Sequence, residues 1–168
     1  MTLPQEVGLV FEAFERNARV NRAVLATLDM PMLDHDDGMG GFSIGQHFAD
    51  MVSFRREWLR AVAPEEAERV PDAIDMNAST WLAATSIADL QASFDAGDAA
   101  VREGVLRAVA EGRRFVGAYE SHPAQIMVHC VVHDAHHRGQ VMALLRQSGR
   151  STEERERLEE ATWPIWRE

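Results

Sequence analysis

The chain has 168 residues, 46% hydrophobic and 26% charged, which suffices for one domain spanning residues 1–168 with a sizeable core. Its formal net charge of −10 disfavours nucleic acid and anionic membranes as partners, because clustered lysine and arginine drive both kinds of binding. We therefore expect neither partner.

Cysteine use and hydropathy indicate a cytoplasmic protein. Cys130 is the single cysteine, which excludes an internal disulfide and is typical of a reducing compartment. The first residues lack the basic start and apolar run of a signal peptide. No apolar stretch approaches the ~20 residues that a membrane-spanning helix needs.

Hydrophobic residues recur at helical spacing near the start of the chain, which predicts a first helix over residues 4–30. Asn21 lies on the apolar face of this helix, either as a hydrogen-bonded core residue or as support for a nearby site. Residues 29–42 are rich in glycine and aspartate and predict a loop.

A second helix is predicted from a capping box formed by Ser43 and Gln46, and it should end near residue 63. Its periodicity predicts that the following residues are buried: Ile44, His47, Phe48, Met51, Phe54, Trp58 and Val62.

The middle of the chain predicts a long loop and a third helix. Residues 64–85 contain two prolines and mixed polar residues, and such a loop can cover a site. Ser86 and Asp89 are suited to cap a third helix. Residues 111–120 then form a connector that we expect to be partly extended.

A fourth helix should begin around Pro123 and end at Gly149, a residue suited to a left-handed helix cap. Ser151 and Glu154 cap a short, charged fifth helix that stops before Trp163.

Four long amphipathic helices, each with one apolar face, pack as a bundle. We therefore predict an all-α four-helix bundle with its core in residues 5–149 and a C-terminal extension over residues 150–168.

Four of the seven histidines lie within nine residues of the predicted fourth helix. His133 and His137 are four residues apart and share a face, while His129 and His136 lie within about one turn of that direction. Two imidazoles at this spacing can reach one metal ion at ~2.0–2.1 Å. A solvated histidine face is the alternative, but the apolar character of the rest of this helix favours metal binding.

A further ligand must come from another helix, and the second helix offers His47 and Asp50, three residues apart on one face. His47 is alternatively a core histidine bonded to a carbonyl group, and Asp50 a solvated or ion-paired side chain. The residue pattern leaves both alternatives open.

The segments SIGQHFADM and HCVVHDAHHRGQVMALLRQSG together resemble the DinB/YfiT superfamily over about residues 5–149. The resemblance implies a four-helix bundle, often dimeric, that holds zinc or nickel between its second and fourth helices. It also implies that His133 and His137 are ligands. The third family ligand is a histidine, but that position holds Asp50 here. Either Asp50 or His47 completes the set, or the site binds metal weakly or not at all.

Three protein ligands leave an open position, where a metal ion can lower the pKa of water to ~7 or hold a thiolate. The resemblance implies transferases that use bacillithiol or mycothiol, and glutathione-dependent isomerases. We therefore expect a metal-dependent thiol S-transferase or hydrolase that acts on a small electrophile, with a low-molecular-weight thiol as co-substrate. His136, Arg138 and Asn21 are candidates for supporting the ligands or binding a substrate anion, although Arg138 is alternatively a structural ion-pair partner.

Two further residues of the fourth helix, Cys130 and Gly139, carry expectations of their own. Cys130 is either a small core residue or an additional sulfur ligand. Gly139 is expected where another helix approaches closely.

An alternative to catalysis is a bundle that acts by association, as a homodimer or with a partner, through the tail LEEATWPIWRE.

Overall fold

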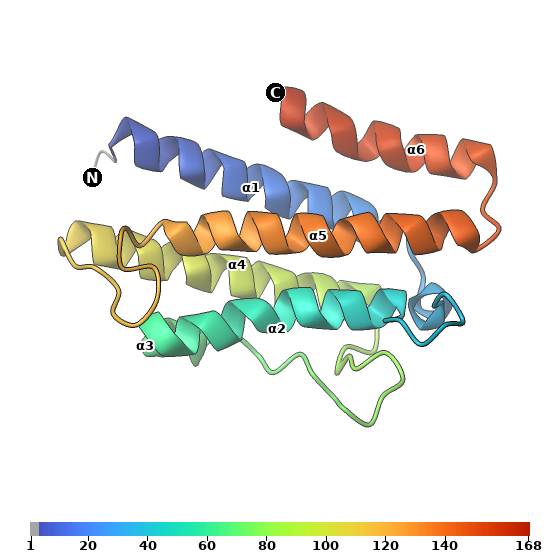
Figure 1. Ribbon diagram of the computed structural model, residues 1–168, viewed down its shortest axis with the longest axis horizontal. Coiled ribbons are helices and arrows are strands. Elements are labelled where there is room, and N and C mark those ends of the chain that lie inside the picture. Colours follow the sequence, from blue (N-terminus) through green and yellow to red (C-terminus); the bar gives the residue numbers. More distant parts are fainter. Residues whose placement is uncertain (1–3) are drawn as a thin grey trace.

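The computed structural model describes residues 4–168 (Figure 1). Its four long helices are α1 (Gln5–Leu25), α2 (Ile44–Val62), α4 (Ile87–Ala110) and α5 (Gln125–Gln147). Its shorter elements are η1 (Met30–Asp34), α3 (Pro64–Ala67), α6 (Thr152–Thr162) and η2 (Trp163–Arg167). These described residues form no strand, only an isolated bridge between Ile74 and Leu82, so the all-α prediction is confirmed.

The long helices form a bundle in which α5 packs against α1 and α2, and α4 packs against the same two helices. After α5 the chain reverses, and α6 lies along α1 (Figure 1). The helix with the histidine cluster is therefore a direct neighbour of the helix with His47 and Asp50. Within residues 4–168, no helix combines the length and apolarity needed to cross a membrane.

Local capping signals set several helix ends where the sequence predicts them. Ser43 and Gln46 form a reciprocal capping box at the start of α2, and Ser151 and Glu154 do the same for α6. Gly149 has a φ of 78°, in the left-handed region that favours glycine after a helix. The α-helical geometry of α6 ends before Trp163 as predicted, but the chain continues as the 3₁₀-helix η2.

The first helix is shorter than predicted, because α1 ends at Leu25 rather than near residue 30. The Asp29 side chain accepts a hydrogen bond from the backbone N–H of Met32 and so caps the 3₁₀-helix η1. Residues 111–120 form a connector without a strand, with turns or bends at residues 111–112, 116–118 and 120.

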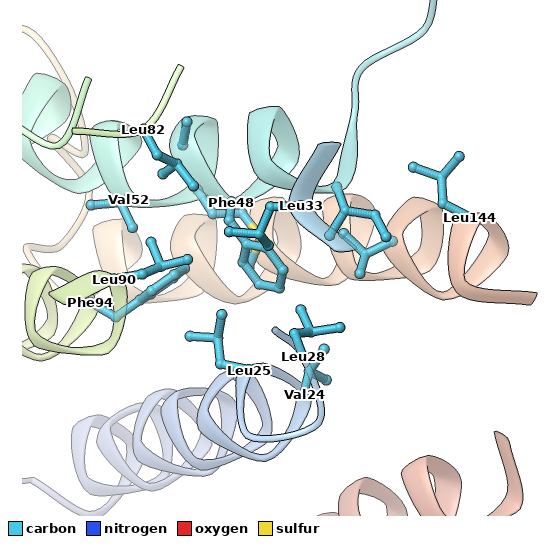
Figure 2. Packing of buried hydrophobic residues seen from close by; sticks show 14 of the residues in the cluster. Val24, Leu25, Leu28, Leu33, Phe48, Val52, Leu82, Leu90, Phe94 and Leu144 are labelled. Atoms are coloured by element: carbon cyan, nitrogen blue, oxygen red, sulfur yellow. The ribbon is translucent and has the colours of Figure 1, made fainter. Parts of the chain in front are cut away.

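The core has two clusters of buried hydrophobic residues, one towards each end of the bundle. Figure 2 shows the first, where side chains of α1, α2, α4 and α5 meet those of η1 and of the loop of residues 68–86 between α3 and α4. The predicted buried face of α2 is wrong at Trp58, whose side chain is 38% exposed. Arg55 is fully buried instead.

Candidate metal centre

Three side chains from two neighbouring helices direct ligand atoms to one point. Oδ2 of Asp50 lies 2.9 Å from Nε2 of His137 and 3.4 Å from Nε2 of His133. All three atoms lie within 4.8 Å of one another. Two atoms that each bind a tetrahedral ion at ~2.0–2.1 Å are ~3.3 Å apart, so this spacing fits a divalent metal. Asp50, His133 and His137 can therefore hold such an ion.

The Asp50 carboxylate is prepared electrostatically for this role. Hydrogen bonds from His133 and then from His137 hold its pKa well below the usual range, against the opposing effect of burial. The group is therefore ionised at neutral pH, as a metal ligand must be. Its side chain is 43% exposed, so this ligand is not enclosed in the core.

His47 lies on the opposite side of the His137 ring. Its Nδ1 is 3.0 Å from Nδ1 of His137, whereas Nε2 of His137 faces Asp50. Burial and, to a smaller extent, the neighbouring His137 lower the pKa of His47 to about 4. A neutral His47 can accept or donate one ring hydrogen bond. The structure thus places His47 in contact with a candidate ligand but outside the group of three converging atoms.

Aromatic rings surround these residues. The Phe54 ring stacks on His133 with ring centroids 3.9 Å apart, and its edge meets His129. The Tyr119 hydroxyl group lies 2.8 Å from Nδ1 of His129. Burial raises the pKa of Tyr119, so its hydroxyl group is protonated. His129 is therefore part of an aromatic wall beside the candidate centre.

The loop of residues 68–86 reaches the other side of the centre. Trp81 from this loop packs against Phe42, and Phe42 packs against His47. Gln46 also donates a side-chain hydrogen bond to the carbonyl group of Ser79. The loop thus covers the beginning of α2, next to His47.

Two of the candidate supporting residues do not face the ligand atoms. His136 is exposed, and its Nε2 lies 2.9 Å from the side-chain nitrogen of Gln140. Arg138 donates hydrogen bonds of 2.6 Å to the side-chain oxygens of Asn17 and Asn21. The third candidate, Asn21, therefore has the role of a hydrogen-bonded core residue.

A buried ionic network lies behind the candidate centre. The Arg55 guanidinium donates to both carboxylate oxygens of Asp134, at 3.1 and 2.7 Å, and to Asp98 at 2.6 Å. Burial opposes its charge, but Asp134 and Asp98 raise the pKa of Arg55 well above its ordinary value. Asn17 and Asn21 donate to Asp134 as well. All four long helices contribute to this network.

Sequence reasoning missed Arg55, Asp98 and Asp134. A usable signal is present in α1, where Asn17 and Asn21 occupy the same side of an apolar helix, four residues apart. Two buried amides on one face need a polar partner in the core. That requirement points to a charged residue inside the bundle, although not to which one.

The remaining expectations for α5 have different outcomes. Cys130 is buried in the second core cluster, and burial raises the pKa of its thiol, so it is a neutral core residue rather than a ligand. The expected close helix approach at Gly139 is wrong, because a Cβ added there would meet nothing within 4 Å.

The protein is thus a helical bundle in which two histidines of α5 and one carboxylate of the neighbouring α2 form a group that can hold a metal ion. The sequence matches the DinB family over residues 3–168, and the chain belongs to that family. Searches of curated proteins and of solved structures found no match.

Proposed function

We propose that the protein binds one zinc or nickel ion through Asp50, His133 and His137. With this ion it acts as a metal-dependent thiol S-transferase or hydrolase. The convergence of the three ligand atoms supports this proposal most strongly. Two histidines and one carboxylate leave at least one position open for a small molecule. When bound, the ion supplies a Lewis acid that stabilises the deprotonated form of a thiol or water.

His47 orients His137 in this proposal rather than binding the ion. With Nε2 directed at the metal, the single proton of His137 is on Nδ1, which then donates to Nδ1 of His47. The lowered pKa of His47 keeps that acceptor unprotonated at neutral pH. His47 therefore fixes the orientation of the ring.

The substrate is proposed to be a small electrophile bound beside the ligand atoms. Phe54, Trp58 and Tyr119 provide an apolar wall on one side. A cavity of about 160 Å³ lies on the other side, between His47, Phe42 and the end of α5. In the transfer reaction, the thiol sulfur forms a bond to the electrophilic carbon, the leaving group departs with its electron pair, and the thiol proton passes to solvent.

The oligomeric state and the cellular location of the protein are also proposed. We propose a cytoplasmic homodimer, in keeping with the single cysteine and the 59% exposed Trp163. That exposed ring also supports the second candidate function, in which the bundle acts by association without turnover.

Metal analysis of purified variants tests the proposal. We expect one equivalent of metal in the wild type and in His136→Ala, whose histidine is exposed beside His137. Asp50→Ala and His133→Ala should lose the metal. His47→Ala should retain it with about 10- to 100-fold weaker affinity, as for other residues that orient a ligand. Equal metal content in wild type and His133→Ala would contradict the site.

A panel of thiols and electrophiles then tests the reaction. We expect turnover that requires added metal and is lost in Asp50→Ala. Stoichiometric metal without turnover for any thiol or for water would instead support the association function.

A further inference from the structure

We infer that a second site, in a cavity between α1, α5 and the C-terminal η2, binds a small monocarboxylate with an apolar tail. The cavity has a volume of about 370 Å³, at the lower end of the roughly 300–1,000 Å³ usual for small-molecule sites. Its lining includes Val20, Val24, Met142, Trp163, Trp166 and Arg138.

This cavity is separate from the candidate metal centre. Ala135, Arg138, Gly139 and Met142 line it from α5. Each helical residue turns by roughly 100°, so these positions lie on the face of α5 opposite to His133 and His137. The inference therefore does not depend on metal binding.

The charge of the ligand follows from Arg138. Its Nη1 donates to the two asparagines of α1, but no carboxylate lies within 4.0 Å of this guanidinium among residues 4–168. The nearby Asp134 is already paired with Arg55. The other guanidinium nitrogens bond to no group of the described chain, and the side chain lines the cavity.

A carboxylate is the anion that best suits this setting. A guanidinium can donate charge-assisted hydrogen bonds to both oxygens of a carboxylate. The other lining side chains are mainly valine, methionine and tryptophan, which favour an apolar tail and offer no further cation to a more highly charged anion. Octanoate has both features and serves as the probe.

A substitution at Gly139 can fill the cavity. Gly139 lines it, and a Cβ built there meets nothing within 4 Å. The Cβ of a leucine at this position therefore has room, and the rest of its side chain would occupy part of the cavity. Gly8 in α1 is also without neighbours within 4 Å of a built Cβ and does not line the cavity, so Gly8→Leu is the matched control.

Calorimetric titration of the full-length protein with octanoate, and with octanol for comparison, tests the inference. We expect saturable one-to-one binding of octanoate to the wild type, to Gly8→Leu and to Asp50→Ala. Arg138→Gln should weaken octanoate binding by about tenfold or more and leave octanol binding unchanged, because only the carboxylate contact is lost. Gly139→Leu should abolish the binding of both.

Circular dichroism of each variant shows whether it is folded, and Gly139→Leu remains decisive if Arg138→Gln does not fold. The inference is overturned if the wild type shows no saturable octanoate binding or if Gly139→Leu binds as the wild type does. Loss of octanoate binding in Asp50→Ala would also overturn it, since the carboxylate would then occupy the metal centre.

Discussion

Arg55 determines how α2 and α5 face each other. Its guanidinium is fully buried and donates to Asp134, Asp98 and the carbonyl group of Met51. Asp134 follows His133 directly on α5, and Arg55 is just over one turn beyond Asp50 on α2. The Arg55–Asp134 ion pair crosses the core and therefore fixes how α2 and α5 are rotated about their axes. This rotation brings Asp50 to the two histidines.

Replacing Arg55 should destabilise the protein strongly. We expect Arg55→Met to lower the free energy of unfolding by about 3–5 kcal/mol, because it leaves the Asp134 carboxylate buried without its cation. Urea denaturation measures this change. Arg60→Met on the same helix is the control, since the exposed Arg60–Glu57 pair contributes only about 0–1 kcal/mol. Equal effects of the two substitutions would contradict the structural role of Arg55.

The candidate site could be predicted from the sequence only in part. Four-residue spacing was enough to predict that His133 and His137 share a face, because helix geometry alone decides it. The sequence could not distinguish His47 from Asp50 as the third ligand, since residues three apart on a helix point in similar directions. Only the packed bundle shows that His47 contacts the far nitrogen of His137.

At the scale of helices, two glycines inside helices have opposite surroundings. A Cβ at Gly97 of α4 would lie 2.7 Å from Cδ of the buried Arg55 side chain. A Cβ at Gly139 of α5 would meet nothing within 4 Å. Gly97 is therefore required for the close packing of α4 against α2, whereas Gly139 is not required by packing.

Alanine substitutions at these glycines should change stability in opposite directions. Gly139→Ala should raise the free energy of unfolding by about 0.5–1 kcal/mol, because alanine is the better helix former. Gly97→Ala should lower it despite the same gain in helix propensity, because Arg55 is held in place by its ion pairs. Thermal unfolding of both variants distinguishes them, and a stabilised Gly97→Ala would contradict the packing at Arg55.

Helix positions were predictable where local chemistry sets them. The capping boxes at Ser43 and Ser151 involve residues three apart, so the sequence carries the whole signal. The end of α1 was not predictable from its apolar periodicity, because Asp29 begins a different element within the same hydrophobic run. The buried position of Arg55 depends on carboxylates 43 and 79 residues away, which periodicity does not relate to it.

At the scale of the whole molecule, a bound ion links α2 to α5 and should stabilise the fold. A ligand at a hundred times its Kd adds about 2.7 kcal/mol to the free energy of unfolding when it binds only the folded state. We therefore expect zinc to raise the Tm of the wild type by several degrees and a chelator to reverse the change. Asp50→Ala should show no such increase, and an equal increase in that variant would place the ion elsewhere.

X-ray absorption spectroscopy of the zinc-loaded protein tests the central claim most directly, because it reports the atoms bound to the ion. The account predicts two imidazole ligands in the wild type and in His47→Ala, with oxygen atoms in the remaining positions at ~2.0–2.1 Å. Three imidazoles in the wild type with two in His47→Ala, or a sulfur ligand from Cys130, would contradict it.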